Sequence, residues 1–271
     1  MGSAKDIVLR PIERRDADTL IKRVHYSGKV VNNSQLSIGV FYAGKLEGAM
    51  QFGPSLDKRK MQGLVRDTGW NDFLELNRMA FSDVLPRNSE SRALGVAMRM
   101  LHKHAPHIQW VVSFADATQC GDGTIYRASG FVLTGIKQNN SLWVAPDSET
   151  AISRLTVTKG KHIIADIALR RGFTEHGGLN MTQGGGGSNM RAYKEAGYTP
   201  IPGFQLRYMY FIDPSARERC TVPILPFSEI ERRGARMYKG VSLCAASIGG
   251  DAFGDQPKEG GAAPTAALHN P

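Results

Sequence analysis

Apolar positions recur with two different periods along the central part of the chain. Two apolar runs, FLELNRMAF (73–81) and IQWVVSFAD (108–116), are typical of strands, and the second is nearly continuous, as in a strand covered on both faces. Between them, RALGVAMRMLHKHA (92–105) has apolar residues at helical spacing, and GTIYRASGF (123–131) predicts a further short helix. The pattern therefore predicts an α/β unit whose two strands lie side by side and part near their carboxyl ends, where such sheets bind ligands.

The segments before this unit predict a strand, a helix and a hairpin. Residues 7–11 form a short apolar run, and residues 14–25 repeat apolar positions on one face of a helix. Gly28 follows as a residue that can take the left-handed conformation at a helix end. Residues 37–53 alternate about an Ala-Gly-Lys turn and predict an antiparallel hairpin. The basic segment 54–72 is expected to be a surface loop or a short helix.

The segments after this unit are less regular. Residues 131–145 predict two strands joined by a turn at Asn139 and Asn140. Helices are expected at 162–172 and in a short run that ends at Gly197, and residues 206–213 predict a further strand.

These elements are expected to form one domain over residues 5–240. Within it, residues 172–189 include four consecutive glycines, which cannot hold a single conformation without a partner. This segment is either a mobile lid over a substrate or a disordered insertion. Residues 241–271 are rich in Gly, Ala and Pro, and we expect a disordered tail.

Composition narrows the class of protein. The chain has 271 residues, of which 41% are hydrophobic and 22% charged, which is typical of a globular protein with a core. It shows no secretory signal and no apolar run of membrane-spanning length, and its three cysteines form no metal-binding or disulfide pattern. A reducing cytoplasm is therefore expected. The formal charge of +9 favours a polyanionic partner such as nucleic acid, although a merely basic surface would give the same number.

Candidate chemistry lies at the ends of the predicted elements. His25 ends the first helix, Asp116 ends the second central strand, and Tyr126 lies on the first turn of the following helix. Each also has an ordinary structural explanation, because a helix dipole favours histidine at its end and aspartate is a common turn former. The serine-rich start of the helix at Ser91 and Arg92 suits an anion, or it simply caps the helix.

The order of these elements, together with IYRASGF (125–131), resembles the GNAT fold. In that family the loop before the central helix usually carries R/Q-x-x-G-x-G/A and holds the pyrophosphate of coenzyme A on backbone amides. The corresponding NSESRALG (88–95) has a single glycine, Gly95, where the family has two small residues. The resemblance implies that Ser91, Arg92 and Gly95 bind a donor, but this departure means that coenzyme A is not predicted and the donor stays open.

A second and closer resemblance spans residues 7–240. Five blocks occur in the order in which the Mom proteins of Mu-like phages carry them: HYSG (25–28), FLELNRMAF, SFADATQ (113–119), GTIYRASGF and PGFQLRYMYFID (202–213). Mom proteins are GNAT-like enzymes that convert adenine in DNA to N6-carbamoylmethyladenine, which protects phage DNA against restriction. The resemblance implies a mixed, twisted sheet flanked by helices, with a C-terminal extension, and a DNA-modifying transferase in the cytoplasm of a bacterial host.

The same resemblance implies the residues of the site. An iron centre is expected at His25, Tyr26, Asp116 and Tyr126. One imidazole with carboxylate and phenolate oxygens is a hard, oxygen-rich set that suits iron. Residues expected to contact substrate or donor, or to act in catalysis, are Asp116, Tyr126, Tyr26, Arg78 and Ser91.

The expected partner is double-stranded DNA whose target adenine is extruded from the duplex. Tyr26, Tyr126 or Tyr208 would hold the extruded base, and Arg207 would hold the DNA backbone. The N6 amine is a poor nucleophile because its lone pair is delocalised into the ring, so a metal would have a role in activation. Two alternatives remain: a coenzyme A-dependent N-acetyltransferase, and a DNA-binding phage protein without enzymatic activity.

Overall fold

The computed structural model describes residues 2–25, 27–118, 121–139, 142–146, 150–153, 174–175, 190–238 and 241–242. Several predictions lie outside these residues: the role of Tyr26, the helix at 162–172, most of the glycine-rich segment 172–189, and the tail beyond residue 242. No helix in the described part of the chain combines the length and the apolar character needed to cross a membrane.

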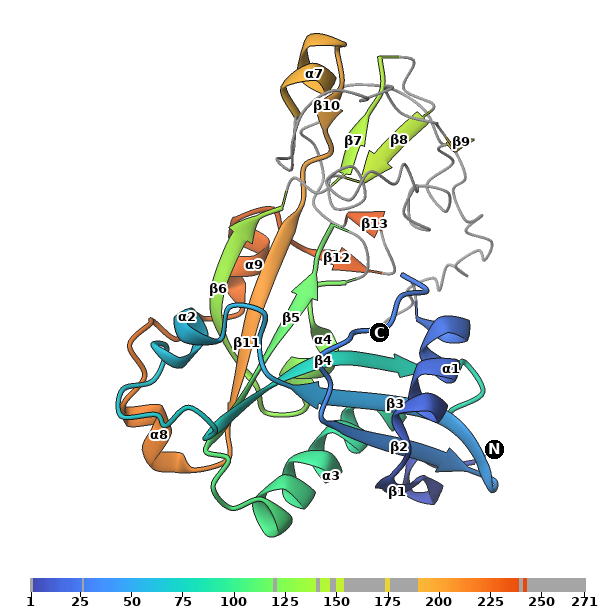
Figure 1. Cartoon of the computed structure of the whole chain (residues 1–271), viewed down its shortest axis with the longest axis vertical. Coiled ribbons are helices and arrows are strands. Elements are labelled where there is room, and N and C mark those ends of the chain that lie inside the picture. Colours follow the sequence, from blue (N-terminus) through green and yellow to red (C-terminus); the bar gives the residue numbers. More distant parts are fainter. Residues whose placement is uncertain are drawn as a thin grey trace, which may run out of the picture.

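The main body is a seven-stranded mixed sheet with the strand order β1-β2-β3-β4-β5-β11-β6 (Figure 1). Its strands are β1 (Val8–Pro11), β2 (Leu36–Tyr42), β3 (Lys45–Gly53), β4 (Phe73–Phe81), β5 (Trp110–Asp116), β6 (Val132–Gln138) and β11 (Phe204–Phe211). Neighbours are antiparallel except β4 and β5, which are parallel. Figure 1 shows β2, β3 and β4 crossing β11 and β6 at a steep angle, so the sheet is strongly twisted. The predicted α/β class, a mixed twisted sheet with flanking helices, is confirmed.

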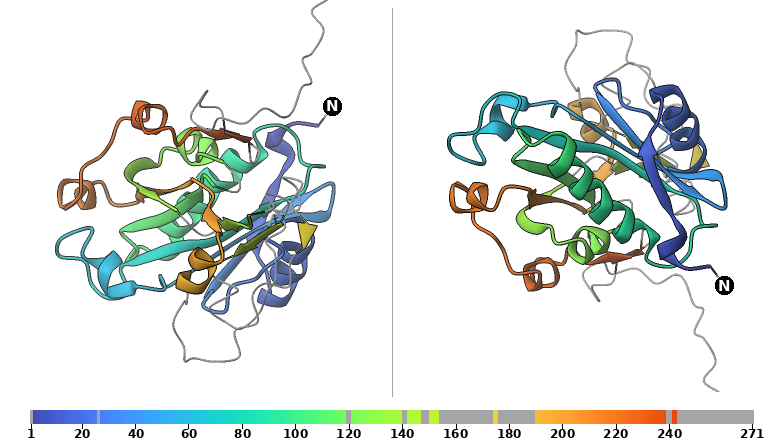
Figure 2. Two further views of the ribbon diagram at one scale, coloured as in Figure 1. Left: turned by 90° about the horizontal axis from the view of Figure 1, so that it is seen from above. Right: turned by 90° about the horizontal axis from the view of Figure 1, so that it is seen from below.

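Helices flank the sheet on both faces. The helical segments are η1 (Ala4–Asp6), α1 (Arg14–Val24), α2 (Lys58–Gln62), α3 (Ser89–His104), α4 (Thr124–Ala128), α7 (Met190–Glu195), α8 (Pro214–Glu218) and α9 (Ser228–Arg232). Successive residues of a strand face opposite sides of a sheet. In β3, Ala49 packs in the cluster of α1, and Met50 packs in the cluster of α3. Therefore α1 and α3 cover opposite faces, and Figure 2 shows α3 lying across one of them in the view from below.

The hairpin of β2 and β3 follows directly from its turn residues. Ala43 and Gly44 both have positive φ, 48° and 78°, which is the conformation of a two-residue turn that matches the twist of the strands. Apolar side chains in the two strands then alternate between the two faces, and Ile38, Val40 and Met50 are fully buried beneath α3. The predicted hairpin over residues 37–53 is confirmed.

The two central strands part as the sequence predicted. β4 and β5 are paired over only three residue pairs: Phe73 with Trp110, Leu74 with Val111, and Glu75 with Val112. β4 then continues beside β3 as far as Phe81, whereas β5 continues beside β11 as far as Asp116. The carboxyl-terminal halves of the two strands therefore diverge.

Two sequence predictions require correction. The helix predicted over residues 92–105 starts three residues earlier, at Ser89, because the serine-rich segment forms its first turn. The hairpin predicted at 131–145 does not form. β6 pairs with β11, whereas β7 (Leu142–Val144) pairs with strands of a second sheet. A turn-forming Asn pair marks a change of direction, but it does not decide which strand becomes the partner.

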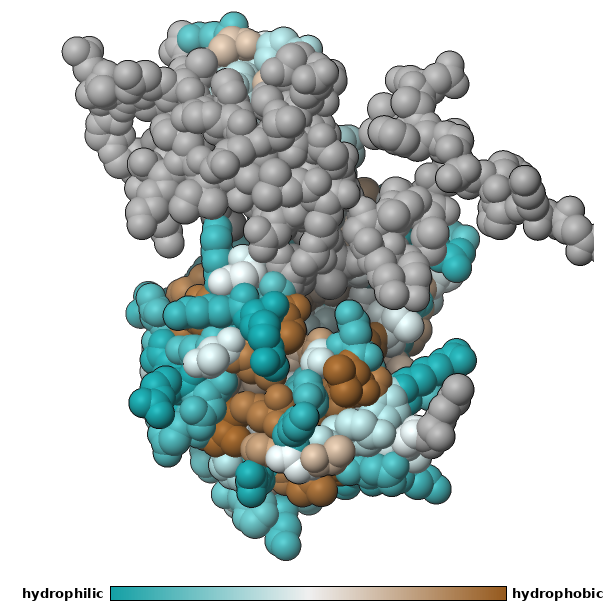
Figure 3. Space-filling model, turned by 90° about the vertical axis from the view of Figure 1, so that its right-hand side faces the viewer, coloured by the Kyte–Doolittle hydropathy of each residue, from teal (hydrophilic) through white to brown (hydrophobic). Residues whose placement is uncertain are grey.

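The second sheet has the order β10-β7-β8-β9 and lies beyond the ends of β6 and β11 (Figure 1). Its other strands are β8 (Thr150–Ser153), β9 (Thr174–Glu175) and β10 (Thr199–Pro200), and a separate pair is formed by β12 (Met237–Tyr238) and β13 (Val241–Ser242). Helix α7 precedes β10, and Gly197 ends it with a φ of 83°, as predicted. On the right-hand side of Figure 1, apolar side chains reach the surface in separate patches among polar ones (Figure 3).

Candidate active site

The point where β4 and β5 part is closed by a short hydrogen-bonded bridge. Ser113 is the first residue of β5 beyond the paired segment, and its side chain is fully buried. Its Oγ lies 2.8 Å from the hydroxyl of Tyr126 and 3.3 Å from the backbone oxygen of Leu76 on β4. The Tyr126 hydroxyl therefore reaches the divergence of the two strands, and its role in a site stays a prediction.

The ring of Tyr126 belongs to the core on the α3 face. It is 8% exposed and packs against Tyr208 and Phe131, with ring centroids 5.1 and 5.4 Å apart. Tyr208 is fully buried, and its hydroxyl donates a hydrogen bond of 2.5 Å to the backbone oxygen of Asp122. Burial also raises the pKa of Tyr208. The interpretation of Tyr208 as a residue that holds an extruded base is therefore wrong, because its ring has no face available to a base.

The side chain of Arg207 is likewise engaged in hydrogen bonds within the sheet. Its Nε donates to Thr134 Oγ1 at 3.0 Å, and its guanidinium also donates to the Thr134 backbone oxygen at 2.8 Å. Burial lowers the pKa of Arg207. These bonds link β11 to β6, and they leave Arg207 poorly placed for the contact with DNA phosphates that the sequence suggested.

Asp116 lies at the carboxyl end of β5. Its Oδ1 accepts hydrogen bonds from the backbone N–H of Thr118 at 2.9 Å and from Asn139 Nδ2 at 3.2 Å. Because side chains alternate along a strand, Asp116 faces the side of the sheet opposite to Ser113. Asp116 and Tyr126 therefore flank the same strand end from its two faces.

The loop after α1 is held against β4 by Arg78. Arg78 Nε donates to the backbone oxygen of Lys29 at 3.0 Å, and residue 78 lies in the half of β4 that has left β5. Within this loop, the backbone N–H of Ser27 donates to His25 Nδ1 at 3.1 Å. The structure therefore brings the loop that begins at His25 together with Arg78, which are two of the predicted site elements.

Three of the four residues implied for iron lie within the described part of the chain, and each of them takes part in hydrogen bonds there. His25 Nδ1 lies 3.1 Å from the backbone nitrogen of Ser27 and 2.9 Å from Ser27 Oγ, so the roles of its two ring nitrogens depend on the tautomer. The Tyr126 hydroxyl is hydrogen-bonded in the core, and Asp116 faces the other side of its strand. Tyr26 lies outside the described residues. The iron centre stays a prediction, and no step proposed below uses it.

The residues predicted to bind a donor lie in the first turns of α3. Asn88 occupies the capping position with a φ of 69°, but its side chain makes no capping hydrogen bond. Ser91 Oγ donates to the Asn88 backbone oxygen at 3.2 Å, and Arg92 is exposed. A side chain at Gly95 would meet only the tip of Arg99, 3.7 Å away, so this glycine is not required by close packing. Their role in binding a donor stays a prediction.

A group of polar side chains that the sequence reasoning missed lies beside the parting strands. Three oxygens in this region are buried and have no hydrogen-bond partner among the described residues, Ser34 Oγ, Gln51 Oε1 and Asn77 Oδ1, and the buried Ser55 hydroxyl interacts with the Glu75 carboxyl. Asn77 and Ser34 both approach Gly53, next to a bulge between Gln51 and Phe52. A Cβ placed on Gly53 would lie 2.2 Å from the Asn33 backbone oxygen and 2.8 Å from Asn77 Oδ1.

Glu75 completes this group, which we call the polar cluster (Ser34, Gln51, Ser55, Glu75 and Asn77). Burial raises the pKa of the Glu75 carboxyl, and the nearby Ser55, Asn77 and Arg78 offset only part of this effect. Buried polar groups in folded proteins nearly always have partners, so such a set indicates a place for a polar ligand or ordered water. The signal in the sequence was the two polar residues, Glu75 and Asn77, inside the apolar strand 73–81.

Comparisons with known proteins show the family of the chain. The family model described as the Mom protein family matches residues 6–229. A protein of Escherichia phage Mu named methylcarbamoylase mom is 34% identical over 218 residues, which cover 80% of each chain.

Among solved structures, the ribosomal-protein-S18-alanine N-acetyltransferase of Escherichia coli matches with a TM-score of 0.41 and 12% identity over 76% of this chain and 94% of its own. An acetyltransferase of Bacillus subtilis, solved in complex with CoA, matches with a TM-score of 0.37 and 10% identity over 76% of this chain and 97% of its own. These structural similarities are too weak to support an argument about function. The family model and the phage Mu relative both cover most of the sequence, and the chain belongs to the Mom protein family.

Proposed function

We propose that this protein transfers a carbamoylmethyl group to the N6 amine of adenine in DNA and thereby protects phage DNA against restriction. The observation that carries the proposal is the identity of 34% to the methylcarbamoylase of phage Mu, over 80% of both chains. In this reaction a bond forms between N6 and the methylene carbon of the transferred group, while the bond from that carbon to a leaving group on the donor breaks. The leaving group departs with the electron pair of that bond, and the amine loses one N–H proton. The identity of the donor stays open.

The polar cluster supports this substrate. The edge of adenine that carries N6 presents two N–H donors beside a ring-nitrogen acceptor. Carbonyl oxygens of Gln51 and Asn77 accept hydrogen bonds, and the hydroxyls of Ser34 and Ser55 donate or accept them. A buried set of this kind favours a flat ligand with both donors and acceptors over an aliphatic one, because each unpaired buried oxygen costs roughly 1–3 kcal/mol.

The substrate also demands extrusion, because the amine of a paired adenine is enclosed by the duplex. Unstacking costs a few kcal/mol, which contacts with the DNA backbone must offset. The formal charge of +9 supplies the long-range attraction for such contacts. Within the site, we propose that Arg78 positions the loop from His25 to Lys29 over the open half of β4, so that this loop encloses the extruded base.

The test of substrate is a measurement on DNA from cells that produce the protein. The DNA is digested to nucleosides and analysed by mass spectrometry, with DNA from cells that lack the protein as the control. We expect deoxyadenosine that carries the added carbamoylmethyl mass. If all deoxyadenosine is unmodified while the protein is abundant and folded, the proposed reaction is wrong.

The test of the site uses two variants in the same assay. Tyr126→Phe removes only the hydroxyl at the strand divergence and keeps the ring packing, and Asp116→Asn keeps the shape of the side chain. We expect each to lower the modified fraction by at least about tenfold, equivalent to roughly 1.4 kcal/mol. Thermal denaturation shows whether each variant is folded, and full modification by a folded variant would remove that residue from the site.

A further inference from the structure

The loop between β3 and β4 carries a side chain that packing does not explain. Leu56 is 95% exposed, more than any other large hydrophobic residue in the described part of the chain. Its neighbour Ser55 is buried and belongs to the polar cluster. A buried residue of the polar cluster, Ser55, is therefore directly followed in the chain by a solvent-exposed apolar side chain, Leu56.

Leu56 projects from a braced base. Just before it, the backbone oxygen of Pro54 accepts hydrogen bonds from Asn33 Nδ2 at 2.5 Å and from Asn77 Nδ2 at 3.4 Å. Just after it, the Asp57 side chain accepts from the backbone N–H of Lys60 and caps α2. Met61 of α2 is buried in a cluster with Phe73 and Trp110. The backbone on both sides of Leu56 is therefore anchored by hydrogen bonds, and its side chain is exposed on an anchored loop.

The surface next to Leu56 is basic. Lys58, Arg59 and Lys60 follow it after the capping residue Asp57, and none of the three makes an ion pair with a carboxylate within the part of the chain that the structure describes. Arg59 and Arg66 line a hollow of about 330 Å³ beside α2. The side chain of Lys58 lies 4.6 Å above the ring of Trp70, which is itself 53% exposed. Cations beside exposed apolar groups suit a polyanion whose interior is stacked and apolar.

An extruded base leaves a gap in the stack of the duplex. Proteins that open DNA commonly insert an apolar side chain between base steps, while cations hold the phosphates on either side. Leu56 has the size and the exposure for this role, and Lys58 to Lys60 are placed beside it. The polar cluster, which suits the edge of an extruded adenine, begins at the adjacent Ser55.

We propose that Leu56 enters the DNA stack in the place of the extruded adenine, and that Lys58, Arg59 and Lys60 hold the adjacent phosphates. This inference rests on the proposed function, because it assigns the surface by which the same reaction obtains its base. The partner is duplex DNA, and the contact of Leu56 does not depend on the sequence of the DNA.

The experiment compares Leu56→Ala with Val84→Ala, which removes the same kind of apolar group from another residue that is 64% exposed. Duplexes carry the fluorescent base 2-aminopurine in place of an adenine at positions found to be modified in cells. Unstacking of this base raises its fluorescence, so extrusion is measured without the donor. A second set of duplexes places an abasic site opposite the 2-aminopurine, where extrusion is already easy.

With Leu56→Ala we expect the fluorescence increase on paired duplexes and the modified fraction in cells to fall by about tenfold, which corresponds to roughly 1.4 kcal/mol. On the duplexes with an abasic site, the same variant should behave like the wild type. Val84→Ala should match the wild type throughout. Thermal denaturation should show both variants folded, since each side chain is mostly in water.

Two outcomes would overturn the inference in different ways. If the wild type modifies adenine, and Leu56→Ala extrudes and modifies the base to the same extent as the wild type, Leu56 does not enter the DNA stack. The proposed function then stands. If the wild type neither modifies adenine nor raises the fluorescence, both proposals fall. As a further arm, Arg59→Ala should weaken the binding of all duplexes by a similar factor, because a phosphate contact carries no information about base pairing.

Discussion

At the scale of single residues, one close contact sets the position of the aromatic group behind the strand divergence. Gly123 precedes α4 with a φ of 82°, and a Cβ there would lie 2.4 Å from the ring of Tyr208. Tyr208 in turn packs on Tyr126 and bonds to the backbone oxygen of Asp122. The absence of a side chain at Gly123 is therefore what lets α4 bring the Tyr126 hydroxyl to Ser113.

Replacing Gly123 by alanine tests this contact, and Gly44→Ala is its control. Both glycines have a φ near 80°, but a Cβ on Gly44 meets nothing within 4 Å. Left-handed strain alone costs about 1–2 kcal/mol, and the clash with a packed ring adds roughly 1–3 kcal/mol. We expect denaturant unfolding to show Gly123→Ala as the less stable variant. If both variants lost the same free energy of unfolding, the ring of Tyr208 would move aside at no cost in stability.

Glu75 provides a prediction about pH. Burial raises its pKa in the folded protein above the ordinary value, so the folded state binds its proton more tightly than the unfolded state does. Ionisation of Glu75 therefore costs stability as the pH rises from the ordinary value of the carboxyl toward the folded value, and this cost is absent at lower pH. Glu75→Gln should raise the melting temperature at pH 7, with a difference that shrinks toward pH 4.

The control for that measurement is Glu229→Gln. Hydrogen bonds from Arg232 lower the pKa of Glu229, so its ionised form favours the folded state. This variant should lose stability at pH 7 relative to the wild type, opposite in sign to Glu75→Gln. A Glu75→Gln protein that melts like the wild type at every pH would show that the carboxyl is solvated and that the polar cluster is not closed.

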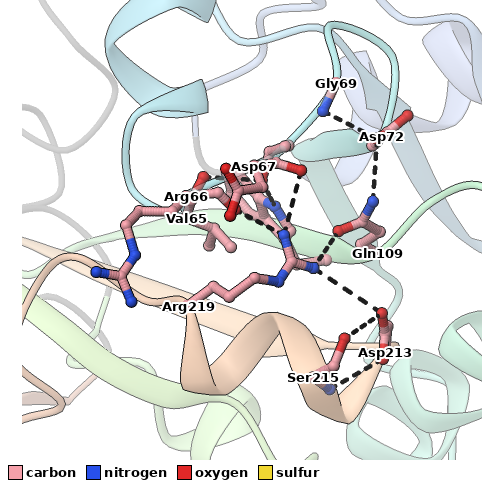
Figure 4. A network of polar contacts seen from close by, with 11 residues as sticks. Val65, Arg66, Asp67, Gly69, Asp72, Gln109, Asp213, Ser215 and Arg219 are labelled. Carbon is pink, nitrogen blue, oxygen red and sulfur yellow. Dashed lines mark hydrogen bonds and ion pairs between the residues drawn. The ribbon is translucent and has the colours of Figure 1, made fainter.

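At the scale of elements, Arg219 makes several of the hydrogen bonds that hold the basic segment 54–72, beside others such as the bond from Trp110 Nε1 to Thr68 Oγ1. The guanidinium of Arg219 donates to the backbone oxygen of Arg66 at 2.6 Å and to Gln109 Oε1 at 2.6 Å. Figure 4 shows this side chain directed at the loop, with Asp213 on its other side. In return, the backbone N–H of Arg66 donates to the Arg219 backbone oxygen. The loop that carries Arg66 therefore depends on α8 for its position.

Arg219→Ala should release this loop. Hydrogen bonds from a charged group contribute about 1.5–3 kcal/mol, so we expect a loss of that order in the free energy of unfolding. Amide hydrogen exchange should accelerate at Arg66 and at Thr221, whose N–H groups bond between the loop and α8. Arg217→Ala, at an exposed position two residues earlier, should change neither quantity. Unchanged protection at Arg66 in Arg219→Ala would show that packing alone holds the loop.

At the scale of the whole molecule, the two faces of the twisted sheet carry different groups of residues. α3 and the aromatic core lie on one face, while α1, the loop held by Arg78 and the polar cluster occupy the other. The parting of β4 and β5 is the point at which these sides approach each other.

The net charge leads to a prediction about salt. If DNA is the substrate, the logarithm of the affinity should fall linearly with the logarithm of salt concentration, by about 0.9 for each phosphate contacted. We expect a slope of roughly −3 or steeper for a surface with Lys58, Arg59, Lys60 and Arg66. Lys60→Ala should make the slope shallower by about 1. A binding constant that does not respond to salt, measured by fluorescence anisotropy, would contradict a phosphate-holding surface.

Much of the local structure could be predicted because its causes are local. The hairpin with Ala43 and Gly44, the helix that ends before His25 and the short helix that carries Tyr126 each follow from a few adjacent residues. The start of α3 was misplaced because the same serine-rich segment suits either a loop or a first helical turn. The polar cluster was missed because its members lie between residues 34 and 77, and nothing local marks them as neighbours.

The sequence by itself determined most elements of the main body, the two central strands that lie side by side and part, the basic character and the family resemblance, since periodicity and turn chemistry act over a few residues. Only the tertiary structure decided that β7 leaves β6, that Tyr208 and Arg207 serve the core, and that Leu56 stands in water beside the polar cluster. These outcomes depend on contacts between residues far apart in the chain. Such contacts stabilise the protein only when the whole sheet has formed, and no local sequence pattern encodes them.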